Sequence, residues 1–196
     1  MALKDLKKGT HSIYGEKLDW TLYDAATLDN AQTEYKFFQL AEGQGTPAKT
    51  QNLTNMTSSA QIPTGQRLRG ARIKLMYHAA ASMAGQTPEA NIAHIYNFLA
   101  NSVFRFLIPG KDSILTMTLQ ELMGISTLIP LVPTATYNVP LALPYFHGIF
   151  PLNKKIILAE QTNFTIEVKC YASTPNAAIK GDVLRIGVNG LLERRS

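Results

Sequence analysis

The stretch of sequence that decides the fold is residues 151–171, PLNKKIILAEQTNFTIEVKCY. In its second half, polar side chains alternate with four apolar ones, which are Phe164, Ile166, Val168 and Cys170. A period of two is typical of a strand that buries one face, and a strand with one wet face belongs to an antiparallel sheet. An apolar run at 156–158 precedes it across a polar break, so the stretch predicts a β-hairpin.

Strand-like segments recur along the rest of the chain, separated by turn signals. They lie at 20–23, 34–40, 67–77, 103–108, 114–117 and 182–192. Within 67–77, Leu68 falls on the opposite parity from Ile73, and a β-bulge at Gly70 would reconcile the two phases. Asn189-Gly190 predicts a tight turn or bulge near the end of the last strand. About seven to nine strands at such intervals predict a β-sandwich.

Helical signals are few in this chain. Thr87 suits an N-cap position and Pro88 the first helical position, which predicts one helix of about three turns at 88–100. Its expected apolar stripe consists of Ile92, Ile95, Tyr96 and Leu99. Residues 118–123 predict a single helical turn closed by Gly124. The expected fold is therefore an all-β antiparallel sandwich with one or two short helices.

The composition fits one domain with an arm. Of 196 residues, 45% are hydrophobic and only 17% are charged, which argues against disorder and leaves a surface with few charges for partners to cover. Residues 1–19 are polar and without periodicity, so we expect an N-terminal arm followed by one domain at 20–196. No window approaches the ~18 apolar residues of a membrane span, and no signal peptide is recognisable, so we expect synthesis in the cytoplasm.

Residues 130–151 differ in character from the rest. Five of the ten prolines fall there, among several aromatic residues: Pro130, Pro133, Pro140, Pro144 and Pro151. Prolines at this density exclude a central strand, and long ordered loops rich in aromatic side chains are usually functional. The segment predicts either a contact surface or a loop that only packs over the open end of the sandwich.

The densest basic run lies on the strand candidate at 67–77. It consists of Arg67, Arg69, Arg72 and Lys74, with no acid among them. The simpler interpretation, which we favour, is a solvated outer strand face; the alternative is a weak contact with nucleic acid phosphates through these four residues. The net charge of +5 permits that contact but does not require it.

No enzyme site is predicted. Residues 43–50 nearly match a phosphate-binding loop, but Ala48 stands where glycine is needed and Pro47 removes a backbone donor. The histidines lack the short spacing of metal sites; they are His11, His78, His94 and His147. Cys170 excludes an internal disulfide, being alone, and is expected to be a small core residue. We therefore predict no catalytic, cofactor-binding or metal-binding residue.

Taken together, these features resemble the single-jelly-roll capsid proteins of icosahedral bacteriophages. The resemblance rests on the polar arm, the lone helix at 88–100, the proline-rich segment, the strand at Phe164 and the closing sequence VNGLLERR from Val188. It implies two four-stranded sheets packed face to face and a virion protein that assembles with copies of itself and with other virion proteins. No cofactor and no catalysis are expected.

Two other classes stay open. A phage decoration protein or receptor- or carbohydrate-binding β-sandwich would use exposed aromatic residues as its binding surface. A cupin-like enzyme would share the jelly-roll topology, but it would need histidines to converge inside the barrel.

Overall fold

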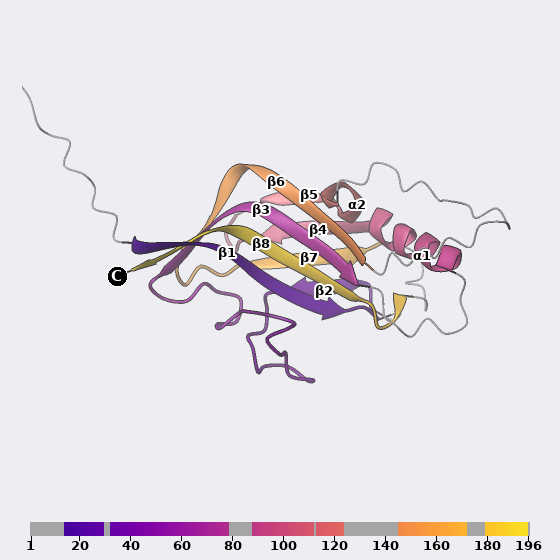
Figure 1. Ribbon diagram of the computed structural model, residues 1–196, viewed down its shortest axis with the longest axis horizontal. Helices are drawn as coiled ribbons and strands as arrows, with labels where there is room; N and C mark the ends of the chain where they lie inside the picture. The colour runs from indigo at the N-terminus through magenta and orange to yellow at the C-terminus, as the bar shows by residue number, and fades with distance from the viewer. Residues whose placement is uncertain are drawn as a thin grey trace, which may run out of the picture.

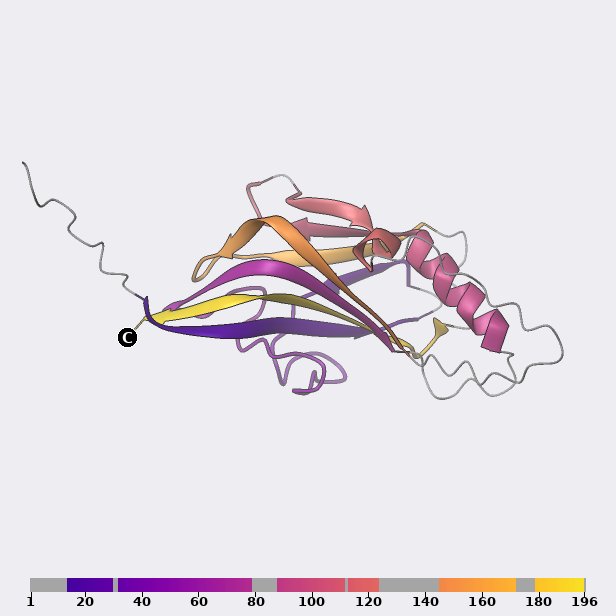
Figure 2. The same ribbon diagram turned by 45° about the horizontal axis from the view of Figure 1, so that its top comes forward.

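The computed structural model describes residues 14–29, 32–78, 88–111, 113–123, 145–171 and 179–195. Within them, eight strands form two antiparallel sheets that pack as separate layers (Figures 1 and 2). In sheet order, the first is β1 (Tyr14–Thr27), β8 (Val183–Arg195), β3 (Gln66–His78) and β6 (Tyr145–Leu158). The second is β2 (Glu34–Phe37), β7 (Thr165–Cys170), β4 (Ser102–Leu107) and β5 (Leu115–Thr118).

The strand order is that of a jelly roll. Successive strands change sheets at every connection except β4 to β5, which are neighbours in the second sheet. Buried side chains from both inner faces form one core between the layers, including Phe104 and Phe106 from β4 and Ile73 and Leu75 from β3. The predicted all-β jelly-roll sandwich is therefore confirmed.

The hairpin predicted for 151–171 is wrong, although its burial pattern is right. Residues 156–158 end β6 in the first sheet, whereas 165–170 form β7 in the second, paired with β2 and β4. The polar break crosses from one layer to the other instead of turning back. Phe164, Ile166, Val168 and Cys170 all point into the core as predicted.

The bulge predicted at Gly70 is confirmed. The register of β3 shifts between Gly70 and Arg72 against both of its neighbours. Because of this shift, the alternation of buried and outward side chains changes phase within the strand. At Asn189-Gly190 the predicted turn is wrong, because β8 continues through both residues, but a bulge does lie there in the ladder with β3, where Gly70 pairs with Gly190 and Arg72 with Asn189. A Cβ on Gly190 would lie 2.0 Å from the carbonyl oxygen of Arg69, so glycine serves close approach of two backbones there.

The two predicted helices are present. The first, α1 (Pro88–Ala100), buries Ile95 and Leu99 as expected, but Tyr96 is exposed and Phe98 is buried in its place, against the rings of Tyr35 and Tyr77. The second, α2 (Leu119–Leu122), starts at a capping box formed by Thr118 and Glu121. Both lie at one end of the sandwich, opposite the C-terminus (Figure 2).

The predicted boundary of the arm is too late, because β1 begins at Tyr14. Residues 14–19 pair with the end of β8, where Tyr14 lies opposite Arg195 and Asp19 opposite Leu191. Residues 145–151 are a second correction: they belong to β6, and Pro151 is tolerated because β6 is an edge strand. The predictions for 1–13 and 130–144 lie outside the described residues.

The segment between β2 and β3 closes the side of the sandwich where β1 and β2 meet. Buried Asp24 of β1 accepts hydrogen bonds from the backbone N–H of Phe38, at 2.6 Å, and from Nζ of Lys49, at 2.5 Å. The side chain of Asn55 bonds the backbone of β1 at Thr21 and Tyr23. Residues 43–48 are exposed, as expected for a surface loop, but this segment also holds the edge of the first sheet.

Candidate functional sites on the first sheet

The predicted basic run does share one face. The four side chains all point outward from β3, while Leu68, Gly70 and Ile73 between them are buried; the four are Arg67, Arg69, Arg72 and Lys74. The bulge after Gly70 makes this possible, because without it the two pairs would face opposite sides of the sheet. The sequence therefore placed these four side chains correctly.

The acid that the run lacks in sequence is supplied by β8. Glu193 lies opposite Arg67 in the register and is only 2% exposed. Its carboxylate accepts from Arg67 at 2.5 Å and lies 3.2 Å from Nε of Arg69. One carboxylate between two guanidinium groups offsets one of their two positive charges, and two of the four residues of the predicted basic run therefore have an acidic partner within the chain.

The remaining cations form a smaller cluster around the middle of the sheet. Arg72 and Lys74 are joined there by Arg185 of β8, which the sequence interpretation did not single out. The guanidinium of Arg185 lies 5.1 Å from the ring centre of Tyr23 and donates to the backbone carbonyl of Asn52. The available signal was the outward parity of Arg185 in a strand whose alternate residues are apolar.

A hollow of about 220 Å³ opens in this cluster. It is lined by Thr21, Tyr23, Lys74, Met76, Arg185 and Gly187. Its setting is electropositive, because Lys74 and Arg185 both line it and none of the lining residues is acidic. The hollow could therefore hold an anion.

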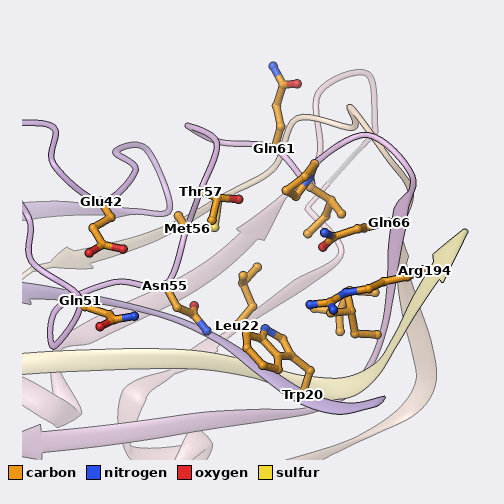
Figure 3. A pocket seen from close by; sticks show the side chains of 14 residues that line it. Trp20, Leu22, Glu42, Gln51, Asn55, Met56, Thr57, Gln61, Gln66 and Arg194 are labelled. Atoms are coloured by element: carbon orange, nitrogen blue, oxygen red, sulfur yellow. The ribbon is translucent and has the colours of Figure 1, made fainter. Parts of the chain in front are cut away.

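A second pocket, of about 250 Å³, lies between the β2–β3 segment and the first sheet (Figure 3). Trp20 stands on one side of it, close to Arg194, and Glu42 and Gln51 stand at the far end. Further amide side chains line it, from Asn55, Gln61 and Gln66. An aromatic ring beside several amides suits a polar ligand with an apolar face.

Other buried polar groups have structural roles. Tyr77 donates to Oδ2 of Asp182 at 2.5 Å inside the core. Burial, followed by this hydrogen bond, raises the pKa of Tyr77 well above its ordinary value. Buried Cys170 packs in the core as predicted.

The histidines come from different elements of the fold. His78 ends β3, His94 lies on α1 and His147 lies in β6, while His11 is outside the described ranges. Over the described part of the chain, no group of three histidine, cysteine, aspartate or glutamate residues could hold a metal ion. Among the same residues, no helix is long and apolar enough to cross a membrane.

In comparison with known proteins, no protein-family model matches the chain, and no curated protein matches its sequence. Any functional proposal therefore depends on the fold and on these surfaces.

Proposed function

We propose that this protein is a structural subunit of a virion, which assembles with copies of itself into an icosahedral bacteriophage capsid and performs no catalysis. The observation that carries the proposal is an apolar edge on the first sheet. Within the described residues, β6 pairs with β3 alone, so its other edge presents unpaired backbone groups. Ile149 and Ile157 of this strand are 46% and 54% exposed.

An edge of this kind favours association. Exposed edge strands template pairing with another chain, and soluble monomers usually protect them with charges, prolines or a covering loop. The opposite edge of the same sheet, at β1, is bonded by Thr54 and Asn55 of the β2–β3 segment. β6 carries Lys154, Lys155 and Pro151 near its middle, but its exposed isoleucines lie on either side of them. Burying two such side chains against a neighbouring subunit would contribute about 2–4 kcal/mol per contact.

A second copy of the chain is the partner that best fits this edge. A shell needs contacts on several sides of each subunit, and the low charge fraction of 17% suits a surface that neighbours cover. The other predicted contact segments are the part of the expected arm at 1–13 and the part of the proline-rich segment at 130–144, both outside the described residues. Virion localisation is part of the same proposal.

Sedimentation velocity over a range of protein concentrations tests this function. The wild-type chain should form discrete oligomers or closed shells, and the double variant Ile149→Lys/Ile157→Lys should lose them while keeping its melting temperature. Both side chains point outward, so the core is not disturbed. Leu40→Lys is the matched control, because Leu40 is 37% exposed but lies in the β2–β3 segment. A wild-type chain that stays monomeric at every concentration would overturn the proposal.

A receptor- or carbohydrate-binding module is the second candidate, and the pocket beside Trp20 favours it. Trp20 is the only tryptophan in the chain and is 37% exposed, so its fluorescence reports directly on that pocket. A monomeric protein whose tryptophan emission shifts on titration with an oligosaccharide panel would support this candidate. Gln66→Leu should then weaken the response, because it replaces a lining amide by an apolar side chain of similar size.

A further inference from the structure

The hollow on the outer face of the first sheet exists because β8 has glycine where a side chain would otherwise stand. Gly187 lies between Tyr23 of β1 and Lys74 of β3 in the register. A Cβ built on it would come within 3.0 Å of the Thr21 methyl carbon and 3.6 Å of the Lys74 Cβ. Even the smallest side chain would therefore narrow the floor of the hollow.

The walls of the hollow carry cations and no acid. Lys74 and Arg185 belong to neighbouring strands, and none of the six lining residues is aspartate or glutamate. On the same face, Glu193 pairs with Arg67 and Arg69, and Asp19 accepts from the side chain of Asn189 at 3.4 Å. An anion in the hollow would meet two positive charges and no carboxylate among the lining residues.

Among the residues that the structure describes, the groups around the hollow still have hydrogen-bond donors to offer. Oγ1 of Thr21 accepts from Nζ of Lys74 at 3.3 Å and from Nδ2 of Asn189 at 2.9 Å, which leaves its own hydroxyl proton to donate. The ammonium group of Lys74 has two further protons. Nε of Arg185 is buried and has no acceptor within the described part of the chain. A tetrahedral oxyanion, with several acceptor oxygens, matches this set.

We propose that this hollow is a phosphate-binding subsite for the backbone of single-stranded nucleic acid, formed by Thr21, Lys74 and Arg185. The exposed side chain of Arg72 continues the positive surface along β3, beyond the size of one phosphate. The ring of Tyr23 is covered by Arg185, so it is not free to stack on a base, and the contact should be independent of base sequence. This subsite does not require shell assembly.

Fluorescence anisotropy of a labelled oligothymidylate with the soluble full-length protein tests the subsite. Lys74→Gln should weaken binding roughly fivefold and lower the slope of log K against log salt by about 0.7, the contribution of one phosphate contact to a single strand. Gly187→Ala should weaken binding without any change of charge, because it fills the floor. Lys169→Gln, which removes a lysine from the outer face of the other sheet, is the control and should bind like the wild type.

Two outcomes would overturn the subsite. One is wild-type affinity in both Lys74→Gln and Gly187→Ala; the other is an equal loss in Lys169→Gln, which would mean that only general surface charge matters. If Gly187→Ala lowers the melting temperature, Lys74→Gln alone decides. Titration with inorganic phosphate and thymidine monophosphate at constant ionic strength distinguishes a nucleic acid backbone from a free phosphate. If these small ligands bound and the oligothymidylate did not, the assignment to nucleic acid would be overturned. These binding measurements do not depend on the oligomeric state, which is the test of shell assembly.

Discussion

The two sheets share one core but differ in their outer faces. The strands of the first sheet have 13 or 14 residues, and its outer face combines paired cations with a group of unpaired ones around Gly187. The strands of the second have four to six residues, and its charges form a ladder in which Lys36 lies 3.4 Å from Glu34 and 3.9 Å from Glu167.

The difference concerns what each face can still bind. A ladder of alternating charges satisfies itself across strands and presents little net field, so the second sheet suits a solvated surface. On the first sheet, one buried carboxylate serves two guanidinium groups, and the remaining cations stay available. We therefore place the candidate ligand and partner contacts on the first sheet.

The largest expected effect comes from breaking the long sheet at its tightest point. Gly190→Ala would place a Cβ 2.0 Å from the carbonyl oxygen of Arg69, which is backbone and cannot rotate away. We expect a loss of at least about 3 kcal/mol in the free energy of unfolding, measured by urea denaturation.

Gly187→Ala in the same strand is the matched control for that change. Its Cβ would meet a side-chain methyl group at 3.0 Å, so a shift of a few tenths of an ångström should accommodate it. Equal stability of the two variants would contradict the idea that Gly190 is required by close backbone approach.

We expect an intermediate loss of stability when the charge of Glu193, the acid beside the basic run, is removed. Glu193→Gln keeps the shape of the side chain but leaves Arg67 and Arg69 without their carboxylate. The free energy of unfolding should fall by about 1–3 kcal/mol, since a buried charge-assisted contact is lost. Affinity for the oligothymidylate should rise, because the outer face loses one negative charge.

The opposite signs of these two effects make Glu193→Gln informative. Urea denaturation gives the stability and anisotropy gives the affinity from one preparation. Glu167→Gln, on the outer face of the second sheet, is the control and should change either quantity little. A Glu193→Gln variant that binds no more tightly would contradict a nucleic-acid contact on this face.

The sequence predicted which face of each strand is buried better than it predicted which strands are neighbours. Periodicity depends on the environment of one strand, so the burial of Ile166 and Val168 followed from local pattern alone. Pairing depends on long-range contacts, and a polar break can turn back within one sheet or cross to the other. The predicted hairpin at 151–171 was wrong for this reason.

The candidate sites were predictable only in part, for a similar reason. The four cations of β3 are close in sequence and share a face, so they were recognised. Glu193 and Arg185 reach the same face from β8, more than a hundred residues later, through a register that no local pattern specifies. Trp20 was assigned to a strand, but its pocket depends on how the β2–β3 segment folds back over β1.

The smallest expected effect concerns His78 at the end of β3 and is measured without any ligand. The pKa of His78 is lowered, by burial first and by the charge of Arg185 second, so the unfolded chain binds a proton more readily than the folded one. The free energy of unfolding should therefore fall as pH drops through about 6.5, the ordinary histidine value, towards the lower folded pKa.

His78→Gln should remove part of this loss. Because His78 is only partly buried, the difference between wild type and variant should be a few tenths of a kcal/mol, measured by urea denaturation from pH 7.5 to 5.5. An unchanged slope in His78→Gln would contradict the lowering of the His78 pKa by burial and by the charge of Arg185.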